Sequence, residues 1–216
     1  MTPFVTTEAK DFLCDRQQVL AWLTENVPAP RLQHILRVET MAAELALHHG
    51  LDVDRAAWAG LLHDLAKYFP PERLLSIARE AGLAITEVDE ADPHLLHADV
   101  SAWVARQQFG VTDEQVLAAV ANHTLGRPGM DALSCVVFLA DSLEPGRGQT
   151  MELEELRKVA QQNLQEAVWR VCDRTLLWLV DQHRLIHPRM ILTRNWAMQV
   201  APAKPKKSEK KGTSKV

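Results

Sequence analysis

A histidine and an aspartate stand next to each other at His63 and Asp64, inside an apolar stretch that spans residues 56–66. An ionised carboxylate within a segment that would otherwise be a buried helix is unfavourable unless a partner neutralises it. A metal cation is a strong partner of this kind, and divalent metals accept both imidazole and carboxylate ligands. The pair therefore indicates a metal site, provided that the rest of the chain supplies further ligands.

Other histidines and acids occur at inward or terminal positions of the helices expected around this pair. His34 shares a helical face with Val38 and Met41, although an isolated histidine on such a face is more often a core residue than a ligand. Asp141 is a second acid embedded in an apolar run. A lone His-Asp pair is weak evidence for a metal site, but an ordered set on five successive helices is much stronger. The candidate ligands are His34, His63, Asp64, His97, His123 and Asp141.

The elements that must position these ligands are helices. Apolar residues recur at helical spacing almost throughout, and no period-two stretch bounded by turn residues appears. We therefore expect an all-α fold, with an N-terminal extension over residues 1–14, one domain over 15–200 and a basic tail over 201–216. The expected helices span residues 15–26, 29–49, 53–67, 71–81, 95–109, 113–122, 132–143 and 153–180, with a last one after His187 and Pro188.

Composition narrows the class of protein. The chain has 216 residues, of which 47% are hydrophobic and 24% charged, enough to bury one sizeable core. The net charge of -4 includes a basic end, because six Lys and one Glu follow residue 203. The remaining body is acidic, which makes nucleic acid unlikely as the main partner. The disordered Lys-rich tail is expected either to touch RNA or an acidic partner weakly or, as an equally good interpretation, to act only as a solubilising extension.

Cysteine usage and the termini indicate an intracellular environment. Cys14, Cys135 and Cys172 are widely spaced, so neither a disulfide framework nor a thiolate zinc site is expected. The chain shows no targeting signal and no apolar run of membrane-spanning length. We therefore expect a cytoplasmic protein that does not enter a membrane.

The order H, HD, H, H, D on successive helices resembles the HD-domain superfamily of metal-dependent phosphohydrolases. Four motifs closely resemble the bacterial YqeK family: LLHDLAK at 61–67, HTLGRPGM at 123–130, LADSLEPGR at 139–147 and LIHP at 185–188. The resemblance covers roughly residues 15–199, and it implies a compact HD-domain helical bundle. It also implies symmetrical hydrolysis of diadenosine tetraphosphate to two ADP. The chain departs from the family pattern at Leu125 and at Ala98 with Asp99. These positions are next to candidate ligands and are not ligands themselves, so the departures bear on how the substrate fits more than on metal binding.

The resemblance implies that His34, His63, Asp64 and Asp141 hold a first metal. His97 and His123 either bind a second metal bridged by Asp64, or contact the substrate phosphate and protonate the leaving ADP; the sequence leaves both roles open. A donor set rich in imidazole favours iron, followed by manganese, cobalt or zinc, over a magnesium-only site. Such a metal activates water and neutralises charge on phosphoryl oxygens.

Cationic side chains close to the ligands are candidates for holding the phosphate chain. Arg31 lies one helical turn before His34, and Lys67 one turn after Asp64. For two of the candidates, Arg127 and Arg194, a solvated surface charge is an equally good interpretation. The expected catalytic residues are Asp64, Lys67, His97 and His123. The expected substrate-binding residues are Arg31, Lys67, His97, His123, Thr124, Arg127, Arg147 and Arg194.

Two alternatives accompany the main hypothesis, a hydrolase of small dinucleoside polyphosphates. One is an HD-type nucleoside monophosphate phosphatase, which would need fewer cations that reach phosphate. The other is a non-catalytic metal-binding helical module. A homodimer is expected only from the family resemblance. The six tryptophans are expected mainly as core anchors, since apolar residues surround them at helical spacing, and stacking of one of them on an adenine is the less favoured alternative.

Overall fold

The computed structural model describes residues 15–201, so the predicted N-terminal extension and nearly all of the predicted Lys-rich tail lie outside the described residues. Within this range the protein consists of α-helices and short 3-10 helices, with no strand, which confirms the predicted all-α fold. None of the described helices is both long enough and apolar enough to cross a bilayer.

The helices follow one another with short connections. They are α1 (Arg16–Asn26), α2 (Ala29–His48), α3 (Val53–Leu62), α4 (Pro71–Glu80), α5 (Glu87–Ala91), α6 (His97–Phe109), α7 (Glu114–Asn122), α8 (Ala132–Leu143), α9 (Met151–Gln162), α10 (Leu164–Asp181) and α11 (Pro188–Val200). Two 3-10 helices, η1 (Pro93–Leu96) and η2 (Pro145–Arg147), precede α6 and α9.

Aspartate side chains begin several of these helices. Asp15, Asp52, Asp113 and Asp131 accept hydrogen bonds from backbone N–H groups in the first turns of α1, α3, α7 and α8. These N–H groups have no partner within the helix, so each carboxylate stabilises the helix start. At the end of α6, Gly110 takes a left-handed conformation with φ 68°, as the predicted glycine stop requires.

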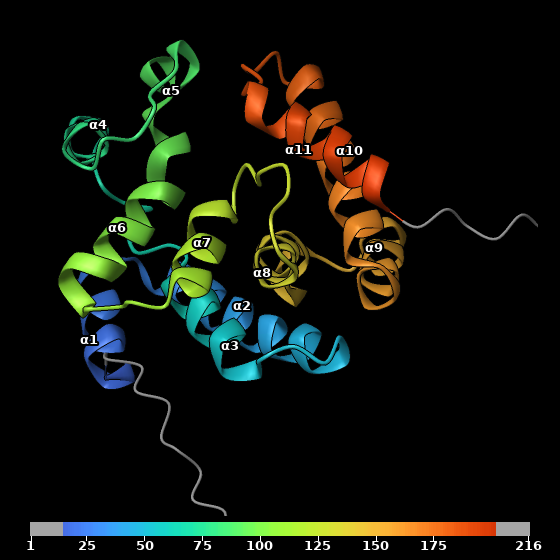
Figure 1. Cartoon of the computed structure of the whole chain (residues 1–216), viewed down its shortest axis with the longest axis horizontal. Coiled ribbons are helices and arrows are strands. Elements are labelled where there is room, and N and C mark those ends of the chain that lie inside the picture. The colour runs from blue at the N-terminus through green and yellow to red at the C-terminus, as the bar shows by residue number, and fades with distance from the viewer. Residues whose placement is uncertain (1–14, 202–216) are drawn as a thin grey trace, which may run out of the picture.

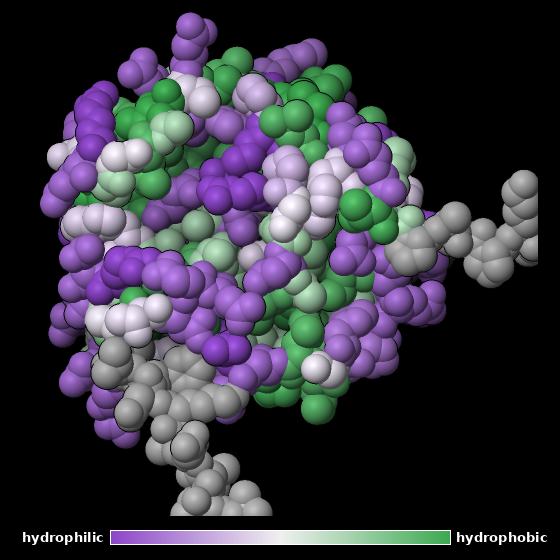
Figure 2. Space-filling model, in the orientation of Figure 1, coloured by the Kyte–Doolittle hydropathy of each residue, from purple (hydrophilic) through white to green (hydrophobic). Residues whose placement is uncertain are grey.

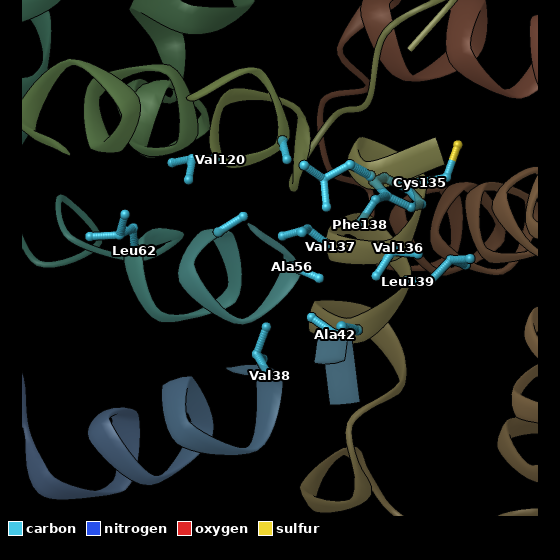
Figure 3. Close-up of a cluster of buried hydrophobic side chains, with 14 of the residues drawn as sticks. Val38, Ala42, Ala56, Leu62, Val120, Cys135, Val136, Val137, Phe138 and Leu139 are labelled. Carbon is cyan, nitrogen blue, oxygen red and sulfur yellow. The ribbon is translucent and has the colours of Figure 1, made fainter. Parts of the chain in front are cut away.

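Helix α8 forms the centre of the core. Nine of its twelve residues are buried, which explains why its sequence is apolar on every side. Figure 1 shows α8 end-on, with α2 and α3 on one side, α7 beside it, and α9 to α11 on the opposite side. Apolar side chains from α2, α3, α7 and α8 meet between these helices, among them Val38, Ala56, Val120 and Val137 (Figure 3).

The prediction that one helix covers residues 53–67 is wrong, because α3 ends at Leu62. Beyond it the chain forms tight turns, in which the backbone N–H of Lys67 donates to the carbonyl of Asp64. The N–H of Ala66 donates instead to the Ser101 hydroxyl, which comes from α6. A contact between distant segments therefore diverts a helix that local periodicity alone would continue.

The single helix expected over residues 153–180 is also wrong, because α9 and α10 are separate helices. Asn163 stands between them in an extended conformation, with φ -156° and ψ 106°. Its side chain accepts the Glu166 N–H and so caps the start of α10. Asparagine is common at helix starts because its side chain accepts a hydrogen bond from a backbone N–H that has no partner in the helix. Since no glycine or proline marks the break between α9 and α10, the sequence gives only a weak signal for it.

Helix α5 was not predicted, although the sequence contains a pattern that could have identified it. The Thr86 hydroxyl accepts the Asp89 N–H, and the Asp89 carboxylate accepts the Thr86 N–H, which together form a capping box. The expected start of a helix at residue 95 shifts as well, since a 3-10 helix occupies Pro93–Leu96 and α6 begins at His97.

Helices α2 and α3 approach closely at Gly60. A Cβ atom there would lie 2.8 Å from Glu39 Cα and 3.1 Å from the Val38 carbonyl oxygen. These are backbone atoms, which cannot rotate away. Replacing Gly60 by Ala gains helix propensity of about 1 kcal/mol, but the overpacking typically costs about 1–3 kcal/mol.

We therefore expect Gly60→Ala to lower the free energy of unfolding measured in urea, and to weaken metal binding because it separates two helices that lead to candidate ligands. Gly82→Ala is the control: its φ of +66° strains alanine, but no heavy atom lies within 4 Å of the added Cβ. The control should lose stability and keep its metal affinity. A Gly60→Ala protein as stable as the wild type would contradict the close approach.

Candidate metal centre

The candidate ligands come together from five helical segments, as their order in the sequence predicts. His34 lies on α2 and Asp141 on α8, while His97 is the first residue of α6. His63 and Asp64 follow the end of α3, and His123 follows the end of α7. Five of the six candidate ligands are at most 5% exposed, namely His34, His63, Asp64, His97 and His123.

The Nδ1 atom of each histidine in the cluster faces a hydrogen-bond acceptor. His63 donates Nδ1–H to the Gly60 carbonyl at 2.7 Å, and His123 donates to the Val120 carbonyl at 2.8 Å. His97 donates to the carbonyl of His94, three residues earlier. In the neutral imidazole, an Nδ1 that donates leaves Nε2 with a free lone pair, which is the atom that can bind a metal.

His34 is fixed in the same way by a carboxylate. Its Nδ1 donates to Glu144 Oε1 at 3.0 Å, and its Nε2 lies 3.0 Å from Asp141 Oδ1. His63 Nε2 lies 3.4 Å from Asp64 Oδ2. Neither Nε2 atom has a hydrogen-bond partner among residues 15–201. A nitrogen lone pair that faces an ionised oxygen is repelled by it, and a cation between the two removes the repulsion.

Two overlapping groups of atoms have the spacing of metal ligands. One contains His34, His63 and Asp141, the other His63, Asp64 and His123, and within each group the donor atoms lie within 4.8 Å of one another. The unpaired Nε2 atoms and the mixed imidazole and carboxylate donors fit a transition metal. The HD residues therefore occupy positions that could hold a metal, and the metal's identity is a separate question.

Asp64 lies between the two parts of the cluster. Its Oδ1 is 3.4 Å from His97 Nε2 and 3.6 Å from His123 Nε2, while its Oδ2 faces His63. This placement suits the bridging role expected for Asp64, which stays a prediction. Burial raises the pKa of Asp64, but positive charge on His63 and a hydrogen bond from His123 lower it further, so the carboxyl pKa stays well below its usual value and the group is ionised. In turn, Asp64 and Asp141 raise the pKa of His63 against the effect of burial, so a proton on His63 offsets the repulsion as a metal cation would.

Asp141 is also held in its ionised form. Burial raises its pKa, while the contact with the His34 imidazole, 3.0 Å from Oδ1, and the charge of Arg147 lower it, with a net shift below the usual value. Arg147 Nη2 donates to Asp141 Oδ1 at 2.6 Å, and Arg147 Nε donates to the Asp141 carbonyl. On the other side of the cluster, Arg31 Nη1 donates to Asp64 Oδ2 at 3.0 Å. Each arginine thus contacts a carboxylate of the cluster.

His97 belongs to neither of the two groups with metal-ligand spacing. Its Nε2 accepts hydrogen bonds from Lys67 Nζ at 3.2 Å and Thr124 Oγ1 at 3.1 Å, and lies 3.1 Å from His123 Nε2. Burial lowers the pKa of His97, and the charges of Lys67 and His123 lower it further, so the imidazole is neutral. Both roles expected for His97, second-metal ligand and phosphate contact, remain compatible with this position.

A cleft of about 740 Å³ opens beside the cluster, within the usual size range of ligand pockets. Lys67, His123, Thr124, Asp141 and Arg147 line it. The molecular surface is hollowed between the side formed by α5 and α6 and the side formed by α10 and α11 (Figure 2). Ligands and cationic side chains are thus exposed to one shared space.

Four of the predicted phosphate-binding residues do not line the cleft: Arg31 and His97, which contact the cluster, and Arg127 and Arg194. Arg194 on α11 donates from Nε to Asp173 on α10 at 2.7 Å, so its guanidinium is engaged in an ion pair. Arg127 is exposed in the turn after α7, and it does not line the cleft. Arg127 is placed as the surface interpretation expects, whereas Arg194 is half-buried in an ion pair, and their roles in binding substrate stay predictions.

Glu144 is a residue of the site that the sequence reasoning missed. It is 1% exposed, and its carboxylate accepts hydrogen bonds from His34 Nδ1, Arg37 Nε and the Gly146 N–H. These donors hold its pKa below the usual value against the effect of burial. The spacing could have identified it, since Glu144 lies one turn after Asp141 and Arg37 lies one turn after His34.

Comparison with known families agrees with this arrangement. The HD domain family matches residues 31–146, a range that contains all six candidate ligands. This chain belongs to the HD-domain family. Among solved structures, a predicted HD superfamily hydrolase involved in NAD metabolism from Clostridium acetobutylicum superposes with a TM-score of 0.82 and 32% identity. The alignment covers 86% of this HD-domain protein and 97% of that chain.

Curated relatives add the reaction class. The symmetrical bis(5'-nucleosyl)-tetraphosphatase of Bacillus subtilis is 34% identical over 84% of this chain and 97% of its own length. The enzyme of the same name from Halalkalibacterium halodurans is 32% identical over 84% and 96%. The similarity spans nearly the whole length of both relatives, and this HD-domain protein is a hydrolase.

The Glu144 contact leads to a testable prediction. Replacing Glu144 by Gln preserves shape but removes the charge that orients His34, and such changes behind a metal ligand typically reduce metal affinity by about 10- to 100-fold. We expect a loss of roughly tenfold or more in affinity, measured by competition with a chelator. Glu114→Gln, which alters the surface pair with Arg106, is the control. Equal metal retention in both variants would show that Glu144 does not position His34.

Proposed function

We propose that this hydrolase cleaves diadenosine tetraphosphate and related dinucleoside polyphosphates symmetrically, giving two ADP from the adenine compound. The observation that carries the proposal is that the His and Asp cluster shares one cleft with the cationic Lys67 and Arg147. Anionic phosphates fit such a cleft, because the cations offset their charge. The names of the Bacillus subtilis and Halalkalibacterium halodurans relatives support this substrate.

His34, His63, Asp64 and Asp141 would hold the first metal, and His123 with Asp64 a second. When bound, the metal supplies Lewis acidity toward a phosphoryl oxygen and lowers the pKa of a water molecule. Iron is the proposed metal, with manganese, cobalt or zinc as alternatives, because a set of imidazole and carboxylate ligands favours a transition metal. Arg31 and Arg147 keep Asp64 and Asp141 oriented through the ion pairs described above.

Lys67 and Thr124 are the residues placed to position the phosphate chain. Both donate to the Nε2 of His97, and both line the cleft. Because Nε2 of His97 accepts these two hydrogen bonds, this atom carries no proton to give as a general acid. Its proposed task is therefore to hold the Lys67 ammonium toward a phosphoryl oxygen, where the positive charge stabilises the negative charge that develops as the anhydride breaks.

The two alternative functions fit this geometry less well. A phosphatase of nucleoside monophosphates needs room for one nucleotide, whereas the cleft continues from the cluster to Arg174 and Trp178 on α10. A non-catalytic metal site needs no cleft lined with cations beside its ligands. Product analysis separates the three functions.

The enzyme loaded with iron or manganese under anaerobic conditions should convert diadenosine tetraphosphate to ADP alone, as followed by chromatography. Asp64→Ala should release metal and abolish turnover, because it removes the carboxylate between the two ligand groups. Asp54→Ala, at an exposed acid near the start of α3, is the control and should keep both. ATP and AMP as products would contradict symmetrical cleavage, and phosphate released only from nucleoside monophosphates would favour the phosphatase.

A second variant separates phosphate positioning from metal binding. Lys67→Ala should reduce kcat by about 100-fold or more, the effect typical of losing one electrostatic donor in an active site. Its metal content, measured by atomic absorption, should equal that of the wild type, because the proposed metal ligands remain. Lys158→Ala, at an exposed lysine of α9, should change neither quantity. Unchanged kcat in Lys67→Ala would remove Lys67 from the mechanism.

A further inference from the structure

Trp178 differs from the other tryptophans of this protein. All six lie within residues 15–201, and five of them pack against the hydrophobic core. Trp178 on α10 is 55% exposed, so for this residue the expected role as a core anchor is wrong. Leaving a large indole exposed forgoes the favourable burial of its apolar surface, so its surroundings decide whether it has a task.

The exposed indole lies on the wall of the substrate cleft. Trp178 lines the same cleft as Asp141 and His123 of the metal centre. Val171 and Arg174 precede Trp178 by seven and four residues on α10, so one helical face presents all three, and each of them lines the cleft. This face combines an aromatic ring with a guanidinium one turn away.

Arg174 is available for a ligand. Its contact with Glu152 is an ion pair of 3.2 Å in which the two side chains are 44% and 63% exposed. Exposed ion pairs of this kind contribute little to stability, so an anionic ligand can replace the glutamate without a large loss. A guanidinium also recognises phosphate well, because its planar fork matches two phosphate oxygens.

We propose that Trp178 is the surface on which one nucleobase of the dinucleotide stacks, and that Arg174 binds a phosphate of the same nucleotide. This inference rests on the proposed function, because a substrate cut at its midpoint carries one nucleoside on each side of the metal centre. The half that extends along the cleft toward α10 meets Trp178. Aromatic side chains stack on any base, so this contact sets affinity for nucleotides over bare polyphosphates.

The test compares Trp178→Ala, Trp178→Phe and, as a matched control on the same helix, Val180→Ala at a residue that is 60% exposed and outside the cleft lining. Stacking of one base on an aromatic ring typically changes binding by roughly 5- to 100-fold. We expect Trp178→Ala to raise the KM for diadenosine tetraphosphate by an amount in this range with a smaller change in kcat. Trp178→Phe should stay within a few-fold of the wild type, and Val180→Ala should not change.

A second measurement is independent of turnover and of Trp178→Ala folding. ADP added to the wild type should quench tryptophan fluorescence, and the quench should be lost or much reduced in Trp178→Phe. Arg174→Gln should raise the dissociation constant for ADP in calorimetry and leave that for adenosine unchanged. Equal quenching in the wild type and Trp178→Phe, or an unchanged KM in folded Trp178→Ala, would overturn the proposal.

Two further outcomes distinguish the possible failures. If the wild type does not hydrolyse diadenosine tetraphosphate but ADP still quenches Trp178, the proposed function fails and the nucleobase subsite stands. If Trp178→Ala changes the sedimentation of the protein and leaves both KM and ADP affinity unchanged, Trp178 belongs to a contact between copies of the chain. That result would overturn the subsite.

Discussion

The structure depends on the repulsion that arises where imidazole nitrogens meet two carboxylates inside the protein, above all at His34 and His63, whose Nε2 atoms have no hydrogen-bond partner among residues 15–201. The backbone and Glu144 fix each histidine so that its Nε2 lone pair points to the centre, where Asp64 and Asp141 are ionised. Without a cation this arrangement is unfavourable, since like partial charges face each other in a medium of low dielectric constant. The packing of the surrounding helices must therefore oppose it until a metal binds.

The helices achieve this through contacts that lie next to the ligands. Gly60 lets the backbones of α2 and α3 meet, and its carbonyl oxygen also accepts the hydrogen bond of His63. The turns after Leu62 take their irregular course because Ser101 accepts the N–H of Ala66. Apolar side chains of α8 fill the space between these helices, as Figure 3 shows. The same few contacts between helices therefore fix both the positions of the metal ligands and the packing of the core.

The cleft extends the same arrangement toward the substrate. Its inner part presents the metal ligands together with Lys67 and Arg147, while its α10 wall presents Arg174 and Trp178. Charge is therefore concentrated where phosphates are expected, and an aromatic surface stands where a nucleoside would extend. The side chains proposed for bond cleavage and those proposed for nucleoside recognition therefore come from different helices.

The sequence by itself determined the helical fold class and the six candidate ligands, because helical periodicity is local and because imidazole and carboxylate are rare on apolar faces unless they have a task. It also placed Lys67 and Arg147 near the ligands, since each is close to one along the chain. Only the tertiary structure decided that Glu144 orients His34, that α3 ends at Leu62, that Arg194 pairs with Asp173 and that Trp178 faces the cleft. Each of these features depends on a contact between segments that are distant in the sequence, and the local sequence pattern does not show which distant residue makes that contact.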